Sequence, residues 1–319
     1  MNVCVIGYRN HAKNIIDILI GSNQVKKIYV FLKKKKKIGY HSKKIEYIYN
    51  LKKFKYKIAF ILSPSNTHYY YINILLKQKC KIFCEKPVCT KLSHLNKIEI
   101  LPLNIKKKIF FNFNLRFSPY FYILKKKIEK KKFFKEINFF HGHSGKKITQ
   151  KTKDIFSTIR GNLGVHYINF ILGLTKKNNN IKIFNFKKKN KNNESITLLI
   201  NKDIFCKISL YYTTPTINKC LAIFENYIIE MNNGNIFIAF KNNKRDNLGK
   251  LIPSKSTQIY KSKNSNQYIN NTLNKSVNYA LKIAKSNRHF SLKDFEDSVI
   301  STKLILKTKN IFNTIDIKN

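Results

Sequence analysis

The residues of this chain best placed to do chemistry are Glu85 and Lys86. They follow a short apolar run, Lys81–Ile82–Phe83–Cys84, and precede Pro87. Upstream, a second apolar run ends in the polar sequence Ser63–Pro64–Ser65–Asn66–Thr67–His68. The segment between them has a helical pattern, so we expect a strand–helix–strand unit with its polar residues at the carboxyl ends of the strands. Open parallel sheets bind ligands at that edge. The sequence therefore predicts a site there with a carboxylate and an ammonium group.

Four segments carry polar residues in a distinctive order. They are Ile61–His68, Cys80–Pro87, Asn114–Leu115–Arg116–Phe117–Ser118–Pro119, and Gly161–Asn162–Leu163–Gly164–Val165–His166 with its continuation to Asn169. Together they resemble the motifs of the Gfo/Idh/MocA oxidoreductases, from Val3 to about Leu174. The resemblance implies a Rossmann-type domain that binds NAD or NADP. It also implies a following α+β domain whose open, mainly antiparallel sheet covers a sugar or sugar-derived substrate and commonly mediates homo-oligomer contacts. The implied reaction is reversible hydride transfer between nicotinamide and substrate carbon.

The resemblance assigns catalysis to Lys86 and His166, which we expect to face one cleft, together with Asn162. An ammonium at Lys86 can stabilise negative charge on a substrate oxygen as hydride leaves the carbon. His166 is the expected general acid and base, because an imidazole titrates near neutral pH. The alternative is a histidine satisfied within an apolar helix. Asn162 replaces an aspartate four residues before His166, and Asn169 also replaces an acid.

The cofactor-binding residues implied by the resemblance are Gly7, Arg9, Asn10, Ser63, Pro64, Asn66, His68, Glu85, Lys86, Asn114 and Arg116. The dinucleotide fingerprint needs a glycine for the tight turn and a second one where the pyrophosphate approaches. Gly7 meets the first requirement, whereas Arg9 occupies the second position and either obstructs the pyrophosphate or pairs with it. The helix that begins beyond this turn would still attract a phosphate through its N-terminus.

The lysine cluster Lys33–Lys37 follows the second expected strand, where NAD-binding domains present an acid to the ribose. A cluster of positive charge there favours the 2′-phosphate of NADP, or reflects only the lysine-rich composition.

Two other functions compete with the oxidoreductase. Arg9, Asn162 and Asn169 favour a catalytically degenerate member of the same fold that binds a nucleotide or a protein. The charge alone favours a basic, RNA-associated protein.

The histidines and cysteines predict no metal site. His141 and His143 lie on the same face of an expected strand, so a three-histidine site with His166 is conceivable. A strand that merely lines the substrate cleft explains them better. Cys80, Cys84 and Cys89 lack the paired spacing of a zinc ribbon.

The predicted elements fall into two domains, residues 1–118 and 119–319. Strands are expected at Val3–Gly7, Lys27–Leu32, Lys57–Leu62, Lys81–Cys84 and Lys108–Phe113, and helices at Ala12–Ile20, Thr67–Lys79 and Ser93–Ile100. This alternation predicts a parallel sheet. After a buried helix, Val165–Leu174, successive β-rich stretches up to Phe240 predict a largely antiparallel sheet. Residues 242–266 have the composition of a long loop, and helices are expected at Tyr268–Ser286 and Ser291–Lys307, both within the second domain.

The composition is that of a globular protein with an extreme charge. The 319 residues are 43% hydrophobic and carry a formal charge of +47. Lysine runs are scattered, arginine occurs at five positions and no nucleic-acid module is evident. An A/T-rich codon bias explains the Lys, Asn and Ile content, so we expect no specific nucleic-acid partner. No apolar run reaches membrane-spanning length and no signal peptide is evident. A cytoplasmic protein is therefore expected.

Overall fold

The chain forms two compact units. The computed structural model describes residues 1–8, 10–33, 42–129, 134–143, 155–175, 180–190, 193–201, 203–286, 288–308 and 315–318. The first unit comprises residues 1–114 and 272–306, and the second comprises residues 115–271 and 307–319.

The first unit contains a parallel sheet with the doubly wound order of a Rossmann fold. Its six strands within the described residues are β1 (Asn2–Ile6), β2 (Lys27–Phe31), β3 (Ile45–Ile48), β4 (Ile58–Ile61), β5 (Lys81–Glu85) and β6 (Ile109–Asn112). They are arranged in the order β3-β2-β1-β4-β5-β6, and every neighbouring pair is parallel. All four residues of β4 and of β6 are buried. Side chains buried on both faces of a sheet account for the continuous apolar runs that predicted these strands.

The helices of the first unit come from both ends of the sequence. They are α1 (Asn10–Gly21), α2 (His68–Leu76), α3 (Leu92–Glu99), α4 (Leu103–Lys106), most of α7 (Ser265–Lys285) and nearly all of α8 (Leu292–Lys307). The predicted boundary after residue 118 differs from this division, because it assigned α7 and α8 to the second domain. Aromatic contacts explain the difference. The rings of Phe110 and Phe290 lie 5.4 Å apart, and those of Phe111 and Phe295 lie 5.6 Å apart.

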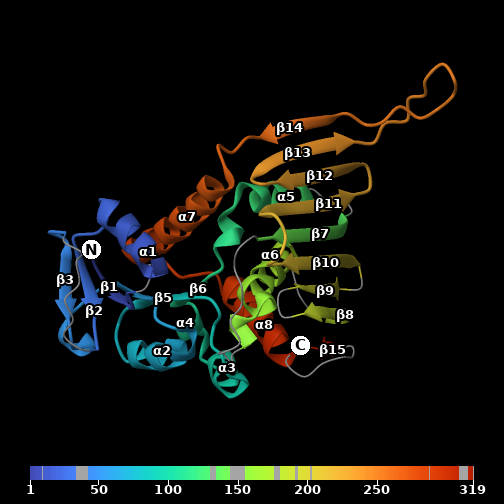
Figure 1. The fold of residues 1–319 in the computed structure, drawn as a ribbon. Coiled ribbons are helices and arrows are strands. Elements are labelled where there is room, and N and C mark those ends of the chain that lie inside the picture. The colour runs from blue at the N-terminus through green and yellow to red at the C-terminus, as the bar shows by residue number, and fades with distance from the viewer. Residues whose placement is uncertain are drawn as a thin grey trace. The chain divides into compact units, whose positions relative to one another are not determined.

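The second unit contains a nine-stranded, mainly antiparallel sheet (Figure 1). Its strands within the described residues are β7 (Phe134–Gly142), β8 (Asn180–Asn190), β9 (Asn193–Ile200), β10 (Ile204–Tyr211), β11 (Ile217–Phe224), β12 (Tyr227–Asn232), β13 (Asn235–Phe240), β14 (Ser256–Tyr260) and β15 (Ile315–Lys318). The order is β14-β13-β12-β11-β7-β10-β9-β8-β15, and only β7 and β10 pair in parallel. In β9 every second residue is buried. This alternation is typical of a sheet covered on one face.

Helices α5 (Pro119–Glu129) and α6 (Val165–Leu174) cover that face. The ring of Phe170 in α6 lies 5.1 Å from the ring of Phe121 and 5.5 Å from that of Phe139 in β7. A five-residue π-helical segment, Arg160–Gly164, leads into α6. Gly164 lies against Ile196 and Leu210, so the start of α6 packs directly on β9 and β10.

The fold class was predicted correctly from sequence. Each predicted strand and helix overlaps an observed one within the described residues, including the predicted helix Val165–Leu174. The helices and strands that were missed are α4, α5, β3, β14 and β15. Strand β14 falls in the stretch predicted to be a long loop, because all but one of its residues are exposed and no apolar alternation marks it.

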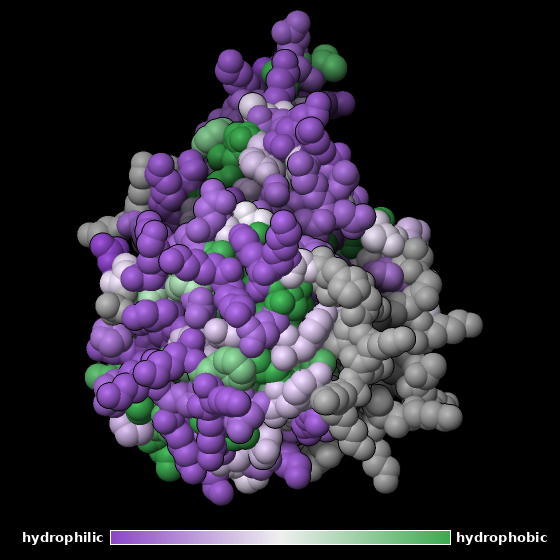
Figure 2. Space-filling view, turned by 90° about the vertical axis from the view of Figure 1, so that its left-hand side faces the viewer, coloured by the Kyte–Doolittle hydropathy of each residue, from purple (hydrophilic) through white to green (hydrophobic). Residues whose placement is uncertain are grey.

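The described surface is mostly polar, as the high lysine content requires. Figure 2 shows a face that is hydrophilic over most of its described area, with apolar residues in small separate patches.

All six cysteines are free and buried. Burial raises the pKa of Cys80 and of Cys89 to about 12. Within the described part of the chain, every helix is too short or too polar to cross a bilayer.

Candidate functional site

The carboxyl ends of three neighbouring strands assemble most of the predicted cofactor residues in the first unit. Gly7 follows β1, Ser63 closely follows β4, and Glu85 ends β5; β4 pairs with β1 on one side and β5 on the other. Strand β1 has β2 on its other side, so the chain changes direction between β1 and β4. Ligands of doubly wound sheets bind at such a switch point. The topology therefore brings these residues to the expected edge.

Gly7 is required by the close approach of two turns. Its φ is 109°, and a Cβ atom there would lie 2.6 Å from the Ser63 nitrogen and 2.7 Å from the Leu62 oxygen. Only glycine fits both the left-handed backbone and this contact. Helix α1 begins three residues later, at Asn10, so its N-terminal N–H groups are at the same edge and suit a phosphate. Arg9 lies outside the described residues, and the side chain of Asn10 is also not described.

The segment after β4 is fixed by its own polar side chains. The hydroxyls of Ser63 and Thr67 lie 2.7 Å apart, and the Thr67 hydroxyl donates to the Pro64 carbonyl at 2.7 Å. Pro64 and Asn66 are exposed, whereas Ser63 is partly buried. This turn therefore keeps Pro64 and Asn66 accessible at the ligand-binding edge.

His68 joins the turns that follow β4 and β5. It is 1% exposed, with Nδ1 2.8 Å from the Pro87 carbonyl and Nε2 3.0 Å from the Ser63 carbonyl. Burial lowers the pKa of His68, and the two carbonyls partly oppose that effect. Both ring nitrogens face main-chain carbonyls, and the predicted cofactor contact of His68 stays a prediction. The contact with Pro87 shows that His68 also fixes the loop that carries Lys86.

Glu85 and Lys86 lie at the end of β5. Glu85 is 9% exposed and its Oε1 accepts a hydrogen bond from Nδ2 of Asn112 at 2.7 Å. Asn112 is the residue opposite Glu85 in the register of β5 and β6. Sequence reasoning missed Asn112, although a polar residue ending the apolar strand Ile109–Phe111 was a usable signal. Lys86 is partly exposed and follows Glu85 directly.

The last two predicted cofactor residues fall on either side of the division between the two units. Asn114 belongs to the first unit, where its Nδ2 donates to the Thr272 hydroxyl at 3.2 Å. Arg116 belongs to the second unit and is buried. It donates to the main-chain oxygen of Asn169 from Nε at 3.1 Å and from Nη2 at 2.7 Å. Gly173 permits this, since a Cβ there would lie 2.8 Å from the guanidinium carbon. The cofactor contact of Arg116 stays a prediction.

The second unit places Asn162 and His166 at the junction of the π-helical segment and α6. Asn162 Nδ2 donates to the Tyr212 hydroxyl at 3.1 Å. His166 follows four residues later and is the second residue of α6. Gly161 is needed here, because a Cβ would lie 2.2 Å from the Ile155 carbonyl oxygen. Lys86 lies in the first unit and His166 in the second, so their common cleft stays a prediction.

The two histidines of β7 and its end contact tyrosines. His141 Nδ1 lies 2.9 Å from the Tyr167 hydroxyl, and the His143 ring meets the Tyr212 ring edge-on with centroids 6.1 Å apart. Burial, with a smaller effect of His143, lowers the pKa of His141 to about 4. His141 is therefore neutral at physiological pH. Among the described residues, no three His, Cys, Asp or Glu side chains come together as metal ligands.

Arg160, two residues before Asn162, forms a buried ion pair that sequence reasoning missed. Arg160 Nε is 3.3 Å from Glu194 Oε2, with both side chains at most 9% exposed. Arg160 Nη1 also donates to the Thr308 carbonyl at 3.0 Å. Charges this deeply buried need a partner, so the pair fixes the start of the π-helical segment against β9.

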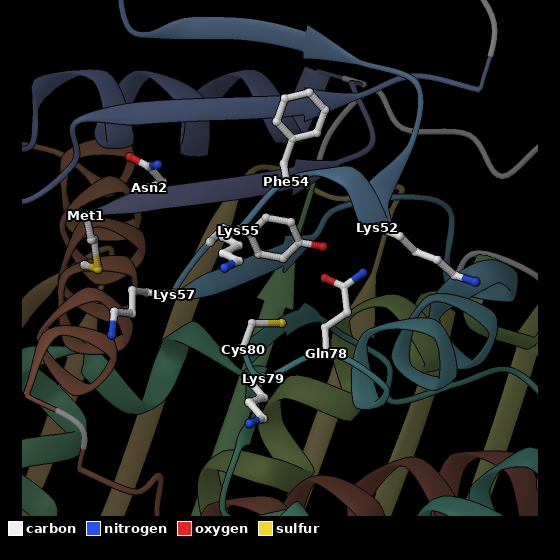
Figure 3. A pocket seen from close by; sticks show the side chains of 10 residues that line it. Met1, Asn2, Lys52, Phe54, Lys55, Lys57, Gln78, Lys79 and Cys80 are labelled. Carbon is white, nitrogen blue, oxygen red and sulfur yellow. The ribbon is translucent and has the colours of Figure 1, made fainter.

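A separate cavity of about 720 Å³ opens at the opposite edge of the Rossmann sheet. Figure 3 shows Met1, Asn2 and Lys57 on one side of it and Lys52 and Gln78 on the other. These residues precede or begin strands β1, β4 and β5. The cavity therefore does not belong to the edge that carries Glu85 and Lys86.

Comparison with known proteins agrees with this geometry. Residues 1–102 match the family model GFO_IDH_MocA, an oxidoreductase family with an NAD-binding Rossmann fold. The predicted resemblance to the Gfo/Idh/MocA oxidoreductases is confirmed. No curated protein matches the sequence significantly.

Several solved structures share the fold over nearly the whole of this chain. A myo-inositol dehydrogenase from Corynebacterium glutamicum has a TM-score of 0.74 and 12% identity, covering 100% of this chain and 99% of that one. The dehydrogenase MviM from Clostridium difficile has a TM-score of 0.70 and 17% identity, covering 97% and 98%. The UDP-N-acetylglucosamine 3-dehydrogenase GnnA from Acidithiobacillus ferrooxidans has a TM-score of 0.69 and 9% identity, covering 96% of each chain. At such low identity the likeness establishes the shared fold.

Proposed function

We propose that this protein is an NAD(P)-dependent oxidoreductase that transfers a hydride to or from a hydroxyl-bearing carbon of a sugar or sugar derivative. The arrangement at the end of β5 carries the proposal. The Asn112 amide holds the Glu85 carboxylate, and Lys86 follows it on a loop fixed by His68. Two proteins of the same fold are named for the oxidation of myo-inositol and of UDP-N-acetylglucosamine, which supports a hydroxylated ring as substrate.

The first unit fits a dinucleotide. The positive φ of Gly7, the start of α1 and the Ser63–Asn66 turn surround the switch point, where backbone N–H groups suit a pyrophosphate. The Glu85 carboxylate suits a ribose hydroxyl. NAD or NADP, when bound, accepts or supplies the hydride. Lys33, exposed after β2, favours NADP as the cofactor, and Lys34–Lys37 lie outside the described residues.

The protein's own groups stabilise charge and move a proton. The Lys86 ammonium donates a hydrogen bond to the reacting substrate oxygen and stabilises the negative charge that develops there. The His166 imidazole takes the proton of that hydroxyl during oxidation and returns it during reduction. Asn162 orients a substrate hydroxyl. An amide cannot take up the proton, so the transfer depends on His166.

A degenerate protein that binds the nucleotide without turnover is the second candidate. Asn162 and Asn169 favour it, since both replace carboxylates. Asn169 is fully buried and its main-chain oxygen accepts two bonds from Arg116, so this residue also has a structural role.

Cofactor titration followed by a turnover assay separates these candidates. The purified protein is titrated with NADH and with NADPH while nicotinamide fluorescence is followed, and is then assayed with myo-inositol and UDP-N-acetylglucosamine. Saturable enhancement with turnover is the expected result. Binding without turnover of a broad panel of sugars and polyols would support the degenerate protein, and failure to bind either nucleotide would reject both.

A further inference from the structure

An ordered hairpin carries the chain away from the nine-stranded sheet between β13 and β14, and Figure 1 shows it extending beyond the ends of these strands. The two arms of the hairpin are paired. The main-chain nitrogen of Ile252 donates to the Lys244 carbonyl at 2.9 Å, and Arg245 forms an antiparallel bridge with Leu251. Residues 241–255, which we call the tip hairpin, therefore have a defined geometry.

Asp246 organises the turn at the end of the tip hairpin. Its Oδ1 accepts hydrogen bonds from the main-chain nitrogens of Leu248 and Lys250, both at 2.9 Å. Its own carbonyl accepts a hydrogen bond from the nitrogen of Gly249 at 3.0 Å, and Gly249 has a φ of 76°. The one carboxylate of the tip hairpin is thus engaged in holding the turn on which Leu248 stands.

Three aliphatic side chains of this turn are exposed to solvent. Leu248 is 80% exposed, Leu251 is 61% exposed and Ile252 is 40% exposed. A single exposed leucine is ordinary on a protein surface. Three aliphatic side chains on residues 248–252 of one ordered turn form an apolar patch, and such a patch indicates a surface that a partner covers.

The same segment is strongly positive. The tip hairpin has four lysines and one arginine against one aspartate, a net charge of +4. The cations are Lys241, Lys244, Arg245, Lys250 and Lys255, and all of them are exposed. Their long side chains can lay the alkyl part along an apolar surface while the charged end stays at a polar one. The tip hairpin therefore suits a partner that is anionic at its surface and apolar beneath.

An anionic lipid bilayer has both properties. Its headgroups attract nearby cations, and the region below them takes up aliphatic side chains. A second copy of the chain would bring its own positive charge, +47 in total, to a segment that is already positive. Nucleic acid would attract the cations but leave the aliphatic side chains in water. A stable protein interface buries about 800 Å² on each partner, whereas a narrow turn offers only a few side chains.

We propose that the tip hairpin docks the protein on the surface of an anionic bilayer. Leu248, Leu251 and Ile252 insert among the lipid headgroups, and the five cations lie beside the phosphates. This attachment is reversible, because three aliphatic side chains bury far less apolar area than a membrane-spanning helix does. It is independent of the proposed oxidoreductase activity, so either can fail without the other.

Cosedimentation with vesicles tests the apolar part of this contact. The full chain is expected to bind vesicles that contain phosphatidylserine, to bind pure phosphatidylcholine vesicles much less, and to be released by salt. Leu248→Ser/Leu251→Ser/Ile252→Ser should weaken binding about tenfold or more. The matched control is Leu92→Ser/Ile100→Ser/Leu103→Ser, at residues of the first unit that are 41%, 80% and 52% exposed. It should leave binding unchanged, and equal losses in the two triple variants would overturn the proposal.

A second pair of variants separates the tip hairpin from the general charge of the chain. Lys241→Gln/Lys244→Gln/Lys250→Gln should weaken binding about 100-fold, at about fivefold for each lysine. Lys52→Gln/Lys53→Gln/Lys55→Gln removes the same charge from exposed lysines of the first unit and should weaken binding less than about threefold. Equal effects would assign binding to the net charge and overturn the proposal. Thermal unfolding of each variant shows whether it folds.

A fluorescent label shows whether the tip enters the bilayer. The six natural cysteines are buried, so a single added cysteine can be labelled selectively. Leu248→Cys carrying a polarity-sensitive dye should brighten and shift to the blue on phosphatidylserine vesicles, whereas Ile100→Cys should not. An unshifted label at position 248 would overturn the proposal. Binding to polyglutamate or single-stranded RNA with no binding to vesicles would also overturn it, in favour of an acidic protein or a nucleic acid.

Discussion

The side-chain nitrogen of Asn112 lies 2.7 Å from Oε1 of Glu85, and the two residues face each other across β5 and β6. The strand register thus positions a carboxylate at the edge of the sheet where the nucleotide is expected. Glu85 is largely buried, so its acceptor geometry depends on protein groups such as this amide more than on solvent.

Asn112→Leu is expected to weaken nucleotide binding about five- to tenfold, the usual effect of one lost hydrogen bond to a positioned group. Leucine has a similar volume, so the buried end of β6 should stay packed. The measurement is fluorescence titration with NADH and NADPH. Asn96→Leu, at an exposed position of α3, serves as the control. Unchanged affinity in Asn112→Leu would show that Glu85 does not need the amide.

Lys86→Met should lower kcat by about 100-fold or more while changing the nucleotide dissociation constant only a few-fold. The reason is that the ammonium acts mainly as charge develops on the substrate oxygen. Lys91→Met removes an exposed lysine from the same loop and should have little effect. If Lys86→Met instead weakened nucleotide binding and left kcat intact, Lys86 would be a cofactor ligand only.

His166→Gln tests the proton transfer through the pH dependence of kcat. In the natural protein we expect one ionisation near neutral pH, because Asn162 does not titrate and burial keeps His141 neutral down to about pH 4. The variant should lose activity and show a flat profile. The exposed His289→Gln variant is the control. A profile that keeps its neutral limb in His166→Gln would assign the proton to another group.

Stability should fall in mildly acidic solution because of His141. Its folded pKa of about 4 lies below the ordinary histidine value of about 6.5, so the unfolded chain binds the proton first as pH falls. The stabilisation is complete above about pH 6.5 and is lost towards pH 4, amounting to about 3 kcal/mol. Urea unfolding of His141→Gln should therefore depend less on pH than that of the natural protein. Some dependence should remain, because burial also lowers the pKa of His68. Parallel curves for the two proteins would contradict the assignment.

The uncovered face of the nine-stranded sheet is expected to bind a second copy of the chain. It contains the apolar Phe140, Phe205 and Leu221, and a shallow depression of about 570 Å³ in which Glu136 and Glu230 lie among Lys207 and Lys219. Balanced charge is unusual in a chain with 16 acidic residues and a formal charge of +47. The two carboxylates would therefore offset the two lysines when two copies meet at this face. Leu221→Lys should give monomers in sedimentation experiments, whereas Leu248→Lys, at a residue 80% exposed elsewhere, should not.

The sequence predicted the sheet edge well because local patterns determine it. Apolar runs followed by polar turns identified β1, β4 and β5, and the parallel arrangement then brought Gly7, Ser63 and Glu85 together. The contribution of Asn112 depends on which residue of β6 pairs with Glu85, and a single sequence does not give that register.

The remaining features depend on contacts between distant segments. Tyr212 meets Asn162, and Arg160 meets Glu194, only after the sheet of the second unit has formed. The return of α7 and α8 to the first unit depends on Phe290 and Phe295, whose apolar character suits either unit equally. The motifs predicted that His68 binds the cofactor. They carry no information on its burial, and so did not predict that His68 also contacts the carbonyls of two loops.

The rate at which the six buried thiols are alkylated should report on local unfolding of the protein. An exposed thiolate attacks an alkylating reagent, whereas these thiols are buried, so the folded chain should resist alkylation. Four of the cysteines lie in the first unit and two in the second. Labelling followed by peptide mass analysis would therefore record, in one experiment, which unit loosens first under heat or denaturant. A nucleotide that binds the first unit should slow the modification of its four thiols selectively.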